Sequence, residues 1–177
     1  MQRQSLSNLP NPYNVSVHPG SGLYLFNTEQ QITYACGFND VTGRLSPVLG
    51  IYDIRIFDFD FTPFDPSPES PKQQDKRISE TIADLLTKFF AAEDIRVLTF
   101  VCDSSDGRGR ERQILFRQWH KSVRDMIDLN PLEITVESDM SKAYGGVLTR
   151  KDFPHKDVLQ TELIDNVRGI ILEKYGR

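Results

Sequence analysis

Residues 95–108 read IRVLTFVCDSSDGR, an apolar run that passes directly into a short polar loop. Apart from Arg96 and Thr99, residues 95–102 are apolar on both faces, which is typical of a central strand covered on both sides. The loop leads into a segment with helical spacing. Because the carboxyl end of a strand and the amino end of a helix converge at such a turn, open sheets often bind ligands there. We therefore expect this junction to organise the fold.

Strand and helix patterns alternate on both sides of the junction. Strands are predicted at residues 23–26, 31–38, 52–61, 95–102, 132–137 and 143–151, and helices at 77–92, 109–127 and 156–174. The order β-β-β-α-β-α-β-β-α predicts an α+β fold, with three helices packed on a mixed sheet of about six strands. Residues 21–177 are expected to form this single domain.

Two segments rich in proline lie outside the regular elements. Residues 1–20 contain three prolines and predict an N-terminal arm that is ordered only where it docks. Residues 62–76 contain four more and predict an exposed proline-rich loop, since proline removes donors and biases its predecessor away from helix.

The clearest periodic patterns belong to one strand and one helix. Phe57, Phe59 and Phe61 alternate with two aspartates, so this strand should have an aromatic face and an acidic face. The helix at 77–92 should begin after Asp75, a favourable capping residue. Its expected core positions are Ile78, Ile82, Leu85, Leu86, Phe89 and Phe90.

Composition narrows the class of protein. The chain has 177 residues, a net charge of −4 and only two cysteines. The acidic balance argues against a protein devoted wholly to nucleic acid, although a local basic face remains compatible with it. No secretory signal, membrane span or disulfide framework is predicted, so a cytoplasmic protein is expected. No cofactor is predicted, and the sequence carries no signal for an oligomeric state.

Cys102 and Arg108 have the Cys-x5-Arg spacing that some phosphatases use. In such loops a thiolate lies beside backbone N–H groups and an arginine that bind phosphate. The strand at 97–102 and an Asp65-Pro66 pair are loosely similar to low-molecular-weight tyrosine phosphatases, in which such an aspartate is the general acid. Asp103 and Asp106 would oppose a phosphate dianion in this loop. A core cysteine followed by a polar turn is the structural alternative.

The acidic face of the aromatic strand suggests a second kind of site. Asp58 and Asp60 are expected roughly 6.5–7 Å apart on one strand face. If Asp103 or Asp106 approached them, the cluster could bind Mg²⁺ and assist phosphodiester cleavage. Solvated aspartates beside a buried aromatic stripe are the alternative.

The helix predicted at 109–127 is strongly basic along one side. With about 100° per residue, four of its cations fall within about 60° of one another. Together with the cation at the helix start, the candidate binding residues are Arg108, Arg110, Arg117, Lys121 and Arg124. Such a face could hold nucleic-acid phosphates or an acidic protein partner, or could simply be solvated.

Arg112 lies near the apolar side of the same helix. We expect it to bend back and pair with Asp103 or Asp106, forming a structural brace across the strand-helix junction. This pairing would account for the acidic loop without a catalytic role.

The sequence resembles a family of small uncharacterised bacterial proteins, mostly from Bacteroidetes, described as a domain of unknown function. The resemblance rests on residues 13–15, 56–59, 77–78, 81–82, 89–90 and 102–108, and on Arg112, Phe116 and Trp119. It implies a bacterial cytosolic protein and supplies no activity or catalytic residue.

The leading hypothesis is a non-enzymatic binding or regulatory protein that uses residues 102–124 as its contact surface. The alternative is a phosphoester-acting enzyme, either a Cys-x5-Arg phosphatase or a metal-dependent hydrolase or nuclease. The first requires exposed, unpaired cations, and the second requires its polar groups to converge in one open pocket.

Overall fold

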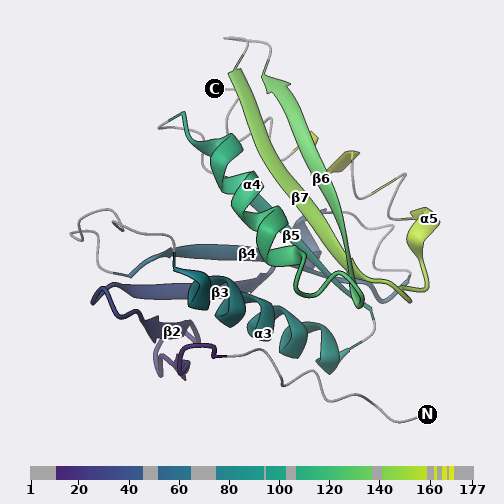
Figure 1. The fold of residues 1–177 in the computed structure, drawn as a ribbon. Helices are drawn as coiled ribbons and strands as arrows, with labels where there is room; N and C mark the ends of the chain where they lie inside the picture. The colour runs from purple at the N-terminus through teal and green to yellow at the C-terminus, as the bar shows by residue number, and fades with distance from the viewer. Residues whose placement is uncertain are drawn as a thin grey trace.

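A computed structural model describes residues 11–45, 52–64, 75–93, 95–102, 107–136 and 141–158, and also residues 162, 165, 166, 168 and 169. These residues form an α+β domain around a seven-stranded mixed sheet of order β1-β2-β3-β4-β5-β7-β6 (Figure 1). The strands are β1 (Ser16–Val17), β2 (Tyr24–Asn27), β3 (Thr33–Asp40), β4 (Arg55–Pro63), β5 (Arg96–Cys102), β6 (Ile127–Val136) and β7 (Ser141–Arg150). Strands β4 and β5 pair in parallel, and the remaining described pairs are antiparallel. The predicted fold class is confirmed.

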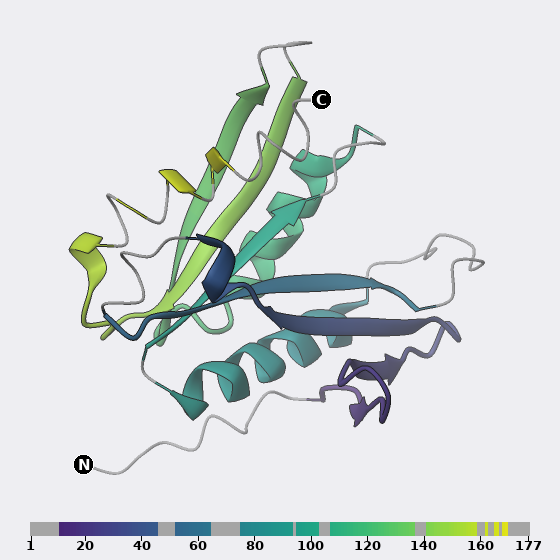
Figure 2. The same cartoon turned by 180° about the vertical axis from the view of Figure 1, so that it is seen from behind.

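The two longer helices, α3 (Lys76–Ala92) and α4 (Gly109–His120), cover the same face of the sheet (Figure 1). Helix α3 begins as predicted, because Asp75 accepts a 2.9 Å hydrogen bond from the backbone N–H of Arg77. Seen from behind, the short α1 (Thr42–Leu45) lies against β4 (Figure 2). A second short helix, α5 (Lys156–Val158), follows β7. Most of the helix predicted at 156–174 lies outside the described residues.

Strand β4 has the two faces that its sequence predicts. Phe57 and Phe59 are buried on the side of the helices, whereas Asp58 is half-buried and Asp60 is exposed. The strand begins three residues later than expected and continues to Pro63, which pairs with Tyr34 of β3. The hydrophobic core therefore lies between the aromatic face of the sheet and α3 and α4.

The helix predicted at 109–127 is too long. Helix α4 ends at His120, residues 121–126 form turns, and Ile127 already belongs to β6. The N–H groups of residues 121–123 bond to carbonyls three positions back, which tightens the chain. Val123 is 4% exposed and packs in the core, so this turn is anchored. Lys121 and Arg124 therefore follow the helix instead of lying along it.

Part of the predicted N-terminal arm is built into the domain. Tyr13 is buried; its N–H donates to Thr81 Oγ1 at 2.8 Å, and its hydroxyl donates to Asp75 Oδ2 at 2.7 Å. Strand β1 then pairs with β2, which accounts for the seventh strand. Of the loop predicted at 62–76, residues 62–63 belong to β4, and residues 65–74 lie outside the described residues.

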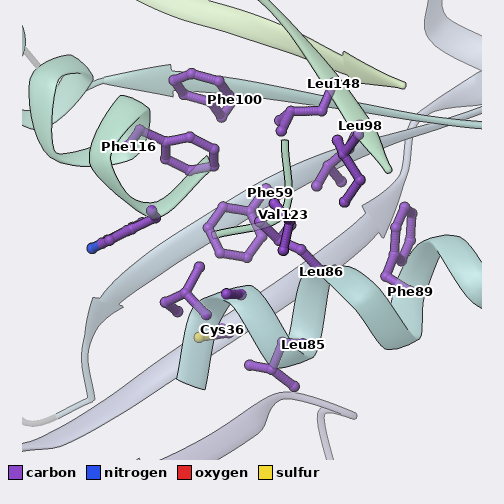
Figure 3. Close-up of a cluster of buried hydrophobic side chains, with 14 of the residues drawn as sticks. Cys36, Phe59, Leu85, Leu86, Phe89, Leu98, Phe100, Phe116, Val123 and Leu148 are labelled. Atoms are coloured by element: carbon purple, nitrogen blue, oxygen red, sulfur yellow. The ribbon is translucent and has the colours of Figure 1, made fainter. Parts of the chain in front are cut away.

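An aromatic stack holds α4 against the sheet. The rings of Phe100 on β5 and Phe116 on α4 are parallel, with centroids 3.8 Å apart (Figure 3). A Cβ on Gly146 of β7 would lie 2.5 Å from Phe100 Cε1, so only glycine leaves room for the ring in this position. Beside the stack, the buried amide of Gln113 donates to the carbonyl of Gly145 at 3.0 Å.

Strand β6 is an edge of the sheet and pairs with β7 alone among the described strands. At its start, His120 Nε2 lies 2.6 Å from the carbonyl oxygen of Ile127. Pro131, near its middle, has no N–H to offer to a further strand. Within the described part of the chain, no helix is long and apolar enough to cross a membrane.

Candidate binding surface on helix α4

Cys102 has the environment of a core thiol. It is 5% exposed, and burial raises its pKa to about 11 against the smaller opposing effect of the Arg112 charge. A thiolate nucleophile requires a pKa lowered toward neutrality, which is the opposite shift. Arg108 is exposed, and its Nε donates to Glu111 Oε2 at 2.8 Å. Asp65, the expected general acid, lies outside the described residues.

The two aspartates of β4 share a face, as predicted, and both accept hydrogen bonds from neighbouring strands. Asp58 Oδ1 accepts from Thr99 Oγ1 at 3.2 Å, and Asp60 Oδ2 accepts from Asn39 Nδ2 at 2.7 Å. No group of three or more His, Cys, Asp or Glu side chains that could hold a metal occurs among the described residues. Asp103 and Asp106, which the metal hypothesis also needs, lie outside them.

The brace predicted across the junction stays a prediction. Arg112 is half-buried, and its positive charge opposes the rise in the pKa of Cys102. Its expected partners Asp103 and Asp106 lie outside the described residues.

The predicted basic face is the feature that the structure makes most distinct. Most of the described lysine and arginine side chains form ion pairs: Arg55, Lys76, Arg77, Lys88, Arg96, Arg108, Lys142, Arg150, Lys156 and Arg168. Within the described ranges, four exposed cations between positions 110 and 124 form none. We call these four, Arg110, Arg117, Lys121 and Arg124, the basic surface. Lys151 likewise forms no ion pair with a described residue.

Arg110 and Arg117 lie on the outer side of α4, two helical turns or about 10.5 Å apart along its axis. Both act on Glu133 of the neighbouring strand β6. The pKa of Glu133 is lowered first by its hydrogen bond from Lys142 and further by these two arginines. Glu133 itself forms an ion pair with Lys142, so the two arginines act on it only at longer range.

Sequence reasoning missed an apolar residue inside the basic surface. Ile114 is 44% exposed, four positions after Arg110 and three before Arg117. These spacings place all three side chains on one side of the helix. The helical projection that collected the cations also contains Ile114, so the signal was present in the sequence.

The inner side of α4 holds this surface in place. Phe116 and Trp119 are buried against β4 and β5, and Gln113 is hydrogen-bonded to β7. Val123 lies between Lys121 and Arg124 in the sequence, and its buried side chain anchors the turn that follows α4. The basic surface is therefore carried by a helix and a turn whose positions are fixed by the core.

A shallow cavity of about 570 Å³ lies on another part of the molecule. It is lined by Tyr13, Asn14, Ser16, Leu25, Phe26, Asn27, Thr28, Glu29, Thr33, Phe64 and Arg77. The guanidinium of Arg77 lies 4.0 Å from the Tyr13 ring centroid, and Arg77 donates 2.7 Å to Glu29 and 2.9 Å to the carbonyl of Asn11. The guanidinium of Arg77 therefore holds the N-terminal segment at residues 11–13 against the domain.

Comparison with protein families identifies the region that contains α3, β5, α4, β6 and β7. A family model described as "Family of unknown function (DUF6169)" matches residues 74–161. This region is therefore similar to proteins of that family, whose function is unknown. The basic surface lies inside the matched region, whereas β1–β4 precede it. No curated protein and no solved structure matches the chain.

Proposed function

We propose that this protein is a non-catalytic binding protein whose basic surface binds an anionic partner. The observation that carries the proposal is the concentration, between positions 110 and 124, of four exposed cations that form no ion pair with any residue that the structure describes. The chain as a whole has a net charge of −4, so this positive charge is local. A local field of this sign attracts anionic partners and orients their approach.

The chemistry of the strand-helix junction supports a binding role over catalysis. A phosphatase loop needs an accessible, low-pKa thiolate, whereas Cys102 is buried and has a raised pKa. Asp58 and Asp60 are engaged by Thr99 and Asn39. The exposed groups that follow this junction include the cations of α4 and of the turn after it, which suit contact with an anionic partner.

The expected binding is electrostatic and therefore sensitive to salt. A single exposed charge pair contributes up to about 1 kcal/mol, so several must act together to give useful affinity. Screening shortens their range to about 10 Å at 0.1 M salt. Affinity should consequently fall as salt is added.

The test compares two double variants that lower the net charge equally. Arg110→Gln with Arg117→Gln neutralises the basic surface, whereas Lys76→Gln with Lys88→Gln neutralises exposed cations of α3. Binding to fluorescent acidic peptides and to duplex DNA is measured by anisotropy in about 20 mM and about 200 mM salt.

We expect the wild-type protein and the α3 variant to bind at least one polyanion at the lower salt. The α4 variant should bind about tenfold more weakly, because it lacks two of the four cations. Absence of binding by the wild-type protein at low salt, or equal losses in both variants, would contradict the proposal.

A further inference from the structure

We infer that the natural partner is an acidic protein segment with an apolar residue between its carboxylates, and that this residue docks on Ile114. The inference rests on the proposed function and assigns the class of partner. Along one side of α4, Arg110, Ile114 and Arg117 present a cation, an apolar group and a second cation. This pattern is the complement of an acidic segment with a central apolar residue.

The exposed side chain of Ile114 favours a protein partner over a nucleic acid. Specific protein interfaces combine a small apolar centre with a polar rim, which is the arrangement of these three residues. A phosphate backbone would leave Ile114 without an apolar contact. Its exposure is also unusual here, since Val17, Tyr52 and Phe64 are the other large apolar side chains exposed in the described part of the chain.

The basic surface lacks a platform for stacking bases. Single-stranded nucleic acids bind through aromatic side chains in a basic groove. Phe116 and Trp119, the aromatic residues of α4, are both buried on its inner side. Glu111 and Asp125 are exposed within the same segment and would repel a long phosphate chain. A short segment with few carboxylates avoids that repulsion.

The geometry also sets the spacing of the partner's groups. Three of the four cations are arginines, whose planar guanidinium groups bind carboxylates through two parallel hydrogen bonds. Arg110 and Arg117 are about 10.5 Å apart along the helix axis. A helical segment with acidic residues seven positions apart, and an apolar residue midway, matches them. Because Lys121 and Arg124 continue beyond Arg117, further carboxylates can be accommodated at that end.

The test uses two synthetic helical peptides of equal charge. Both have glutamates seven positions apart, with leucine midway in one and serine midway in the other. Duplex DNA is the third probe. Affinities are measured by anisotropy at about 20 mM salt for the wild-type protein and for Ile114→Ala. Since Ile114 is exposed and alanine favours helix, this variant should fold normally, which circular dichroism checks.

We expect the wild-type protein to bind the leucine peptide about fivefold more tightly than the serine peptide, and more tightly than DNA. Ile114→Ala should abolish the difference between the peptides and leave the affinity for the serine peptide unchanged. Equal binding of both peptides, a preference that survives Ile114→Ala, or tighter binding to DNA would overturn this inference. In those cases the proposed binding function would still be supported if binding falls with added salt and is weakened by Arg110→Gln with Arg117→Gln. Failure of all three probes to bind would refute both.

Discussion

Gly146 stands at the closest approach between β7 and the aromatic stack, so its replacement tests the packing there. In Gly146→Ala the new Cβ would lie 2.5 Å from Phe100 Cε1 and 3.1 Å from the carbonyl oxygen of Asn130. The ring has little room to move because it stacks on Phe116. We expect the free energy of unfolding to fall by about 1–3 kcal/mol, measured by urea denaturation.

Gly43→Ala is the matched control for this substitution. A Cβ at Gly43 would have no neighbour within 4 Å, and the residue lies in α1. Its stability should equal that of the wild-type protein or exceed it slightly. Equal stability of Gly146→Ala and Gly43→Ala would show that the stack can shift to admit a methyl group.

Cys102 should be protected from alkylation in the folded protein. Its pKa of about 11, compared with an ordinary value of 9.0, lowers the thiolate fraction near neutral pH by about a hundredfold. Burial restricts access further. We expect slow labelling by iodoacetamide in native buffer and rapid labelling in urea, followed by peptide mass spectrometry. Rapid native labelling of Cys102 would reopen the thiolate hypothesis.

At the scale of elements, Tyr13 connects the N-terminal segment to α3. Its hydroxyl donates to Asp75 and accepts from the N–H of Glu29 at 3.2 Å. Tyr13→Phe keeps the ring but leaves these partners unmatched, so we expect the free energy of unfolding to fall by about 1–2 kcal/mol.

Tyr24→Phe provides the control for Tyr13→Phe. The Tyr24 ring packs edge-on against Phe38, and its hydroxyl makes no hydrogen bond within the described ranges. Its stability should stay within about 0.5 kcal/mol of wild type in the same denaturation assay. A loss as large as that of Tyr13→Phe would argue that the docking hydrogen bonds contribute little.

The elements were predictable wherever local patterns determine them. The core side of α3 and its Asp75 cap follow from helical spacing and from the chemistry of orphan N–H groups. The end of α4 did not, because apolar positions Val123 and Met126 continue the helical period into the turn. In the structure these two side chains pack against the core from a tightened turn that leads into β6. The end of the helix therefore depends on tertiary packing.

At the scale of the whole molecule, an ion-pair network joins elements distant in sequence. Arg55 at the start of β4 pairs with Asp40 of β3 at 2.8 Å and with Glu93 after α3 at 3.5 Å. Hydrogen bonds from Thr42 and from Arg55 lower the pKa of Asp40 from 3.8 to about 2. The lowered pKa means that folding favours the ionised carboxylate.

This shift predicts a specific acid dependence of stability. The contribution of Asp40 should be complete above about pH 4 and should disappear as the pH falls toward 2. Because the side chain is 44% exposed, the effect at neutral pH should be about 1 kcal/mol or less. In urea denaturation, Asp40→Asn should be less stable than wild type at pH 7, and the gap should narrow at pH 3. A gap that widens in acid would contradict the assignment.

The candidate site was only partly predictable from sequence. Helical spacing collected Arg110 and Arg117 correctly, because both lie within the true helix. It could not show that these cations form no ion pair with the described residues, since pairing depends on strands that approach from elsewhere, such as β6 with Glu133. Nor could it show that Cys102 is buried by the packing of α4. Both properties arise from tertiary contacts.

The edge strand β6 could pair with strands of other molecules when the protein is concentrated. A long edge strand normally offers a template for strands of other molecules, which leads to sheet extension and aggregation. Here the carbonyl oxygen of Ile127, at one end of the strand, is hydrogen-bonded to His120 Nε2. Near the centre of the strand, Pro131 has no backbone N–H to donate to another strand. The histidine at the end of α4 therefore also leaves fewer groups of the β6 edge for a strand of another molecule to pair with.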